Sequence, residues 1–111
     1  MANITVERRK HNRVKFETVV DLKLPSDAGR FISRGRVKDI SLGGLKFESC
    51  QELSTNELLV SFCNGSFLDG SEIECRVIRA VKDKLSYIYG VEFKKLNLLD
   101  KAKIWYKTTA A

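Results

Sequence analysis

Short runs of strand-forming residues between turn signals are the feature that most limits what this chain can fold into. Six such runs are present, and in the first of them Val20 and Leu22 alternate with charged residues, as in a strand with one buried face. The runs span residues 16–24, 30–40, 45–49, 58–63, 73–81 and 85–93. Gly35 inside the second run is expected to mark a β-bulge, and the Asp69-Gly70 pair marks a hairpin end. Many short strands with frequent turns predict a mainly β chain that forms a closed or nearly closed antiparallel barrel.

One segment near the end of the chain, residues 97–107, differs from the rest because its apolar residues recur at helical spacing. Asn97 is placed to cap this helix, and Asp100 lies in the first turn, where the helix dipole favours a carboxylate. We expect the helix to cover one end or one side of the barrel and to pack through its apolar residues. These are Leu98, Leu99, Ala102, Trp105 and Tyr106. The periodicity does not distinguish an SH3-like barrel from an OB-fold or a split barrel.

The length of 111 residues fits a single domain, and a hydrophobic content of 43% is enough to form a core. We expect an arm over residues 1–15, the barrel over residues 16–95 and the helix over residues 97–107. The arm is basic and has no apolar periodicity, which predicts that it is flexible until a ligand orders it. Lys and Arg outnumber Asp and Glu by 20 to 14, and the resulting net charge of +6 favours anionic partners.

The sequence shows no features of an exported or membrane-spanning protein. The N-terminus lacks the apolar stretch of a secretory signal, and the longest uncharged run, residues 58–68, is too short to span a bilayer. We therefore expect a cytoplasmic protein without membrane insertion. The three cysteines do not have zinc-ligand spacing, and we expect them to be reduced thiols packed as small hydrophobic side chains.

Two short motifs carry the candidate functional residues, one before the first predicted strand and one between the second and the third. The first has the form R-x-x-x-R with an additional arginine before it, and the second has the form D-x-S-x-x-G. Their residues are Arg8, Arg9 and Arg13 in the first motif and Asp39, Ser41 and Gly44 in the second. Arg30 and Arg34 also have the first spacing, but they lie inside a predicted strand. Taken singly, the arginines fit a solvated basic tail, and the second motif fits a plain Asx or Ser turn.

Together the two motifs resemble the paired signature of the PilZ domain family. The resemblance continues at residues 89–93, Tyr-Gly-Val-Glu-Phe, which are similar to the late Gly-Val-x-Phe strand that precedes the family's terminal helix. It covers the chain from about Glu7 to Tyr106, with the motifs in the right order. The resemblance implies a PilZ-like split barrel of six strands with a C-terminal helix. It also implies a receptor for the second messenger cyclic di-GMP, in which the six motif residues contact the ligand.

The chemistry of the motif residues agrees with such a ligand, which offers two phosphodiesters and two guanines. Arg9 and Arg13 can bind O6 and N7 of a guanine, hold a phosphate or stack on a base. In an extended arm they lie about 13 Å apart, a distance on the scale of the ligand. Asp39 can accept hydrogen bonds from guanine N1–H and N2–H, and Ser41 can donate to N7 or a phosphate oxygen. Gly44 is expected to allow a positive φ or a close backbone approach.

We therefore expect a bacterial cyclic di-GMP receptor. We do not expect an enzyme, because the chain has one histidine and no Gly-x-Ser-x-Gly or phosphate-loop motif. No metal or cofactor is expected. In similar PilZ domains an arginine at the place of Arg8 accompanies two bound ligand molecules, so we expect two molecules of cyclic di-GMP per domain. The ligand would order the arm and so signal to an effector protein. The alternatives are a basic nucleic-acid-binding barrel, which would bind polynucleotides in a salt-dependent way, and a protein adaptor with a degenerate site.

Overall fold

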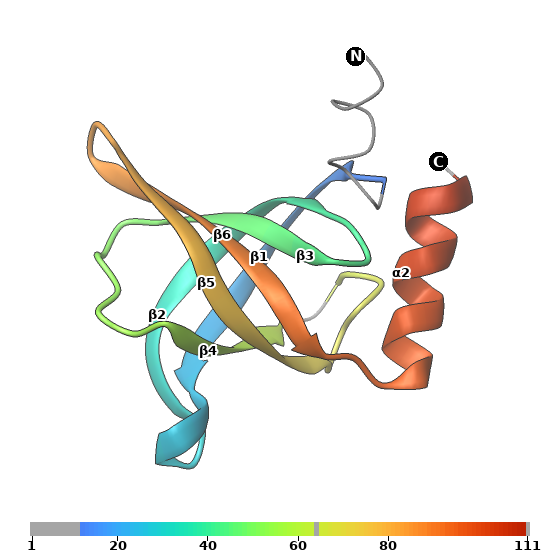
Figure 1. The fold of residues 1–111 in the computed structure, drawn as a ribbon, viewed down its shortest axis with the longest axis horizontal. Coiled ribbons are helices and arrows are strands. Elements are labelled where there is room, and N and C mark those ends of the chain that lie inside the picture. Colours follow the sequence, from blue (N-terminus) through green and yellow to red (C-terminus); the bar gives the residue numbers. More distant parts are fainter. Residues whose placement is uncertain (1–11, 64, 111) are drawn as a thin grey trace, which may run out of the picture.

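Six antiparallel strands close into a barrel in the computed structural model, which describes residues 12–63 and 65–110 (Figure 1). The elements are β1 (Val14–Leu24), the 3-10 turn η1 (Pro25–Asp27), β2 (Arg30–Ile40), β3 (Gly44–Ser49), β4 (Glu57–Phe62), β5 (Glu72–Asp83), β6 (Ser86–Lys95) and the helix α2 (Leu98–Ala110). The strands follow the order β1-β2-β3-β6-β5-β4 around the barrel, and β4 pairs back onto β1. The predicted six-stranded antiparallel barrel with a C-terminal helix is confirmed.

The core is built by one face of each strand, as the alternation in the sequence predicts. Val20 and Leu22 of β1 are fully buried, and Phe47 of β3 is the largest side chain with no exposed surface. The core contains Val20, Leu22, Val37, Ile40, Leu45, Phe47, Leu58, Val60, Phe62, Leu68, Ile73, Cys75, Tyr89, Val91 and Ile104. Every strand contributes at least two of these residues, so the barrel interior is a packed core and not a cavity.

The bulge expected at Gly35 lies elsewhere, so that prediction was wrong. Gly35 pairs with Val20 in an uninterrupted stretch of the β1–β2 ladder. A Cβ atom on Gly35 would lie 3.0 Å from Cδ1 of Phe47, so the glycine provides space for this ring. Two irregularities in β2 lie on either side of Gly35 instead. One is at Ile32, because Ser33 pairs with Leu22 while Phe31 pairs with the adjacent residue of β1, Lys23. The other is at Lys38, because Val37 pairs with Phe47 while Asp39 pairs with the adjacent residue of β3, Lys46. Strand β2 therefore has one residue more than β3 at this point.

Helix α2 lies beside the barrel and next to the loop between β4 and β5 (Figure 1). Asn97 caps it as expected, because its Oδ1 accepts a hydrogen bond of 2.7 Å from the backbone N–H of Asp100. The side that packs is not the apolar one that the sequence predicts. Ile104 is fully buried, and Asp100 and Thr108 on the same side are 4% and 6% exposed. The Ser71 hydroxyl of the β4–β5 loop donates a hydrogen bond of 2.7 Å to Asp100, which ties the helix to this loop.

The predicted packing residues of the helix face outward, so this expectation was wrong. Leu98, Leu99, Trp105 and Tyr106 are 84%, 65%, 55% and 69% exposed, and Ala102 is exposed as well. In the part of the chain that the structure describes, no helix is both long and apolar enough to cross a membrane.

The cysteines differ in their surroundings. Cys75 is buried in β5, and this burial raises the pKa of its thiol to about 12, whereas Cys50 at the end of β3 is exposed. The expectation that all three thiols are packed in the core was therefore wrong for Cys50.

This difference predicts selective alkylation, because the thiolate is the reactive form and a raised pKa keeps Cys75 protonated at neutral pH. Iodoacetamide should modify Cys50 quickly in the folded protein and leave Cys75 unmodified until the chain is unfolded. Mass spectrometry of peptides from native and denatured samples measures both rates. Labelling of Cys75 at the rate of Cys50 in the folded protein would contradict this description of the core.

Candidate ligand-binding site

Residues of the two sequence motifs meet at one end of the β1–β2 ladder. Arg13 lies directly before β1, and Asp39 lies near the end of β2, where it pairs with Lys15. Nη1 of Arg13 is 2.5 Å from Oδ1 of Asp39, although 26 positions separate the two residues in the sequence. Arg8 and Arg9, the other predicted residues of the first motif, lie outside the described residues.

Asp39 lies between cations from two different elements. Nζ of Lys46, on β3, is 3.6 Å from Oδ2 of Asp39, while Arg13 contacts the other carboxylate oxygen. The carboxylate is 15% exposed and the Arg13 side chain 38% exposed, so both are accessible at the surface. Arg13 uses one of its five N–H donors in this ion pair, and among residues 12–63 and 65–110 the others have no hydrogen-bond partner, so they can meet an anion or a base. The carboxylate can accept further hydrogen bonds at its remaining lone pairs.

The extra residue in β2 is the reason why Asp39 faces outward. Ser33, Gly35 and Val37 are buried, and strict alternation would place Asp39 inside the barrel with them. Lys38 shifts the alternation by one residue, so that Ile40 points into the core and Asp39 remains at the surface. The bulge therefore reconciles a buried Ile40 with a surface carboxylate two residues after the buried Val37.

Ser41 begins the tight turn between β2 and β3 and is 3% exposed. Its backbone N–H donates a hydrogen bond of 2.8 Å to the carbonyl oxygen of Gly44. Its hydroxyl accepts one of 3.1 Å from the N–H of Gly43 and donates a longer one, of 3.4 Å, to the same Gly44 oxygen. The sequence assigns this hydroxyl to the ligand, but in this structure it holds the turn. The N–H of Phe93 donates to Gly43 at 2.9 Å, which fastens the turn to β6.

Gly44 is required by a close backbone contact. A Cβ atom at this position would lie 1.9 Å from the carbonyl oxygen of Val91 and 2.9 Å from Cα of Glu92, both on β6. Gly44 is not among the glycines with a positive φ. Of the two reasons expected for this glycine, the structure therefore shows the close approach.

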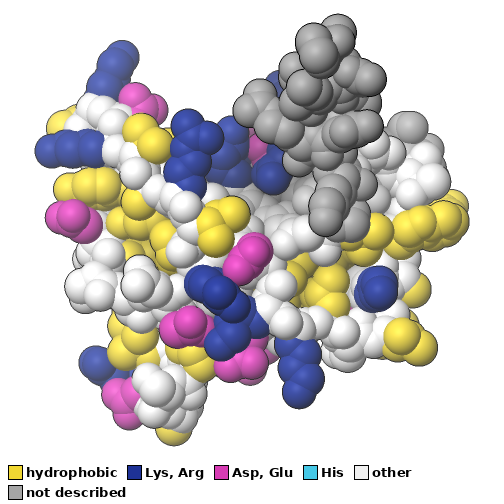
Figure 2. Space-filling model, in the orientation of Figure 1, with side chains coloured by type: hydrophobic (Ala, Val, Ile, Leu, Met, Phe, Trp, Pro, Cys, Tyr) yellow, Lys and Arg dark blue, Asp and Glu magenta, His cyan; other side chains and the backbone are white. Residues whose placement is uncertain are grey.

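A basic groove next to Asp39 was not predicted from the sequence. It has a volume of about 290 Å³ and lies across β3, β6 and β5; its lining residues are Lys46, Arg79, Val81, Lys82, Asp83, Ile88 and Gly90. Gly90 pairs with Lys46 on one side and with Arg79 on the other, so these three residues form a row across the strands. Because Gly90 has no side chain, the space between the two cations is open. Figure 2 shows Lys and Arg side chains gathered on and beside the β5–β6 hairpin.

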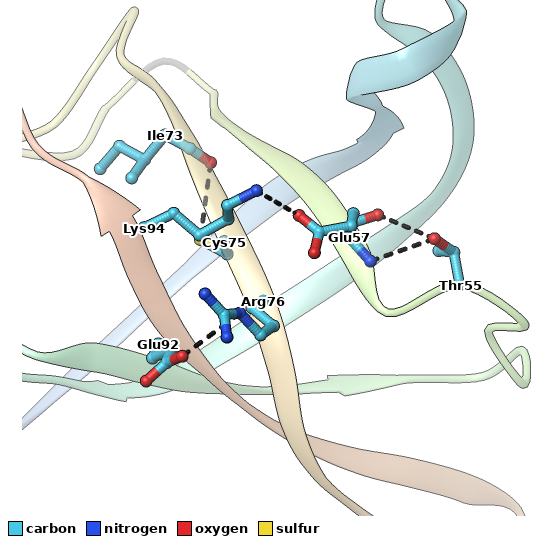
Figure 3. Close-up of polar contacts among 7 residues, drawn as sticks. All are labelled: Thr55, Glu57, Ile73, Cys75, Arg76, Glu92 and Lys94. Atoms are coloured by element: carbon cyan, nitrogen blue, oxygen red, sulfur yellow. Dashed lines mark hydrogen bonds and ion pairs between the residues drawn. The ribbon is translucent and has the colours of Figure 1, made fainter.

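Two cations of this groove, Arg79 and Lys82, differ from Lys46, which contacts Asp39, and from the cations on the neighbouring part of the barrel. On β4, β5 and β6, Lys94 contacts Glu57 at 2.7 Å, and Arg76 contacts Glu92 at 3.4 Å (Figure 3). Among the described residues, Arg79 and Lys82 have no carboxylate within ion-pair distance. The groove is therefore a place where an anionic group would find cations that are not neutralised by these carboxylates. Residues 12–63 and 65–110 contain no cluster of three or more His, Cys, Asp or Glu side chains able to hold a metal ion.

One residue of the sequence, Gly90, is a weak indication of this groove. A glycine at position 90, in a strand otherwise made of larger residues, indicates a close approach or an open space. Which cations border this space depends on the register of three strands, and the pattern of residues along one strand does not contain that register.

The two glycines of this region provide a matched test. Gly44→Ala forces a side chain into the backbone of β6, and we expect it to lower the free energy of unfolding by about 3 kcal/mol or more. Gly90→Ala should change it by less than about 1 kcal/mol, because a Cβ atom there makes an ordinary contact of 3.5 Å with Cβ of Arg79. Urea unfolding of both variants measures the difference. Equal stabilities would contradict the close approach at Gly44.

Comparisons with known proteins agree with this architecture. The sequence model of the PilZ domain matches residues 7–107. The Bacillus subtilis inhibitor of motility, MotI/DgrA, is similar in structure with a TM-score of 0.71 and 18% identity, over 93% of this chain and 50% of that one. The PilZ domain of YcgR from Escherichia coli, whose structure contains c-di-GMP, has a TM-score of 0.64 and 17% identity, over 93% of this chain and 90% of that one.

The chain spans about half the length of two similar structures, 50% of MotI/DgrA and 45% of the longer Escherichia coli YcgR structure. A search of curated proteins by sequence finds no match. The family match includes both motifs and every strand of the barrel. This chain belongs to the PilZ domain family.

Proposed function

We propose that this PilZ domain is a receptor for cyclic di-GMP, that it binds the ligand over the outer face of the barrel at Asp39, and that it is not an enzyme. The ion pair between Arg13 and Asp39 is the observation that carries the proposal, because it brings the two motifs to one place. The complexes of YcgR and of K. pneumonia MrkH with c-di-GMP, which share this fold, support the choice of ligand.

The roles of the site residues follow from their donors and acceptors. Asp39 accepts hydrogen bonds from N1–H and N2–H of a guanine, and Arg13 turns its free N–H groups to a phosphate or to O6 and N7 of the base. Arg9 and Arg8 act in the same way from the arm. Gly44 and Ser41 act through the turn, which the close contact with β6 holds in place. Ser41 can donate to the ligand once its long hydrogen bond to Gly44 opens.

The basic groove completes the charge balance of the site. Cyclic di-GMP carries two phosphodiester anions, and the row formed by Lys46, Gly90 and Arg79 offers two cations on either side of an open space. Lys46 also contacts Asp39, so the groove is continuous with the place where a guanine would bind. We propose that one phosphate lies at this row while the arm arginines hold the other.

Signalling would follow from the arm. Its like charges repel one another, and ligand phosphates would neutralise them and supply contacts that fix it against the barrel. The ordered arm would change the surface beside the Asp39 site, and an effector protein would recognise the changed surface.

The first test is binding by site variants. Arg13→Ala and Asp39→Ala should each weaken cyclic di-GMP binding by about 10-fold to 100-fold, because each removes charge-assisted hydrogen bonds. Arg34→Ala is the matched control, since Arg34 also contacts an aspartate, Asp21 at 3.2 Å, and belongs to the other R-x-x-x-R spacing. Isothermal titration gives the affinities, and circular dichroism shows that each variant is folded.

Three results would overturn the proposal. The wild type could give no heat with cyclic di-GMP, Arg34→Ala could weaken binding more than Arg13→Ala, or a single-stranded oligonucleotide could compete as well as cyclic di-GMP does. The last of these would favour a nucleic-acid-binding barrel.

The second test concerns stoichiometry. Two ligand molecules carry four phosphate charges, and Arg8 adds a third guanidinium to those of Arg9 and Arg13. We expect titration of the wild type to end near two equivalents of cyclic di-GMP and that of Arg8→Leu to end near one, since an apolar side chain cannot compensate the second molecule. An endpoint of one equivalent for both proteins would contradict the second bound molecule and the role of Arg8 in binding it.

A further inference from the structure

The outer side of α2 carries an apolar strip formed by Leu98, Leu99, Ala102, Trp105 and Tyr106. The four large residues are 84%, 65%, 55% and 69% exposed. With 3.6 residues per turn, the five positions fall within an arc of about 120° on the helix. They therefore form one continuous surface, and hydrophobic side chains are visible at this side of the molecule in Figure 2.

The strip is not needed to hold the helix in place. The opposite side of α2 packs through Ile104, which is fully buried, and through Asp100 and Thr108. Asp100 is fixed at both of its polar groups, because its carboxylate accepts a hydrogen bond from the Ser71 hydroxyl and its backbone N–H donates one to Oδ1 of the cap residue Asn97. The four large apolar side chains of the strip contribute little to the core and form an exposed patch. Exposed apolar patches on a protein surface mark sites of interaction.

Lysines border the strip on both edges. By helical geometry Lys101 lies about 40° beyond Trp105, and Lys103 lies about 40° beyond Leu99 on the other edge. Lys101 and Lys107 are exposed, and Lys103 is half-buried. Asp100, the one acidic residue of the helix, is buried and bonded to Ser71, so it does not reduce the positive charge of the outer surface.

We propose that the outer face of α2 docks on the surface of an anionic phospholipid bilayer, with the helix lying in the plane of the membrane. Leucines would enter the boundary of the acyl chains, Trp105 and Tyr106 would lie at the level of the headgroups, and Lys101 and Lys103 would reach the phosphates on either side. The net charge of +6 adds a longer-range attraction to an anionic surface. This function is separate from cyclic di-GMP binding and does not depend on it.

Two other occupants of the strip fit the charges less well. A second copy of the chain would bring the lysines of one helix against those of the other. A protein partner would meet a strip whose edges are lysines, and lysine is depleted in protein interfaces. A membrane with anionic headgroups is the surface that uses both the apolar strip and the cations on its two edges.

Trp105 provides the measurement, because it is the single tryptophan of the chain. Its fluorescence emission should shift to shorter wavelength when the protein is mixed with vesicles of equal parts phosphatidylglycerol and phosphatidylcholine. Vesicles of phosphatidylcholine alone should leave the emission unchanged. The protein should sediment with the anionic vesicles, and salt should release it because the attraction is screened.

Variants that keep Trp105 test the strip and its edges separately. The double change Leu98→Ser and Leu99→Ser should reduce partitioning into anionic vesicles about tenfold or more. Lys101→Gln with Lys103→Gln should reduce it about 25-fold, from about fivefold for each charge removed. Leu85→Ser is the control, since Leu85 is 94% exposed on the β5–β6 turn, away from α2. It should bind like the wild type.

Three outcomes would overturn the proposal. The Trp105 emission and the sedimentation could be unaffected by anionic vesicles, which would leave the strip to a protein partner. The emission could shift with protein concentration alone while the protein elutes as a dimer, which would make the strip an interface between two copies. Vesicle binding could persist in the Leu98 and Leu99 variant and be lost in Arg13→Ala, which would place the contact at the ligand site.

Discussion

The backbone of β3 lies so close to that of β6 at Gly44 that no side chain fits between them, and the arrangement of the site depends on this contact. A Cβ atom there would lie 1.9 Å from the Val91 carbonyl oxygen. The contact fixes where β3 begins, and the hydrogen bonds of Ser41 and Phe93 then determine the turn that precedes it. Asp39 is held just before this turn. The site is therefore built on rigid elements, which is what precise placement of a carboxylate requires.

The register of the strand pairing positions the other residues around Asp39. The extra residue Lys38 turns Asp39 outward, and the pairing of Asp39 with Lys46 places the first cation beside it. The pairing of Lys46 with Gly90, and of Gly90 with Arg79, continues the basic surface across two more strands. Three strands thus align residues that are far apart in the sequence, and the glycine in the middle leaves an open space between the two cations.

Local sequence patterns are sufficient to predict some elements of this structure. The succession of six short strand-like runs separated by turns predicted the barrel, and the Asn97 cap predicted the start of the helix, because both depend on local sequence. The packing side of α2 was not predictable from hydrophobicity, since it includes Asp100 and Thr108, whose burial depends on Ser71 and on the helix backbone. The bulge at Lys38 and the row through Gly90 arise from pairing between strands. The role of Ser41 within the turn likewise depends on contacts that a single motif does not contain.

The Asp39 site and the apolar strip of α2 are separate surfaces, although β6 links them. The Asp39 site is fastened to β6 through Phe93, and α2 begins only a few residues later, after Leu96 and Asn97. On the other side of the turn, Leu42 and Lys101 line a space of about 290 Å³ between the turn and the helix. Energetic coupling between sites is carried by packed side chains, hydrogen-bond networks and rigid elements that have two discrete arrangements. The helix is held by Ile104 in the core and by the hydrogen bond between Asp100 and Ser71 of the β4–β5 loop. The geometry therefore favours two surfaces that act independently on one rigid barrel, so that an anionic ligand at Asp39 and a contact on α2 can be present together.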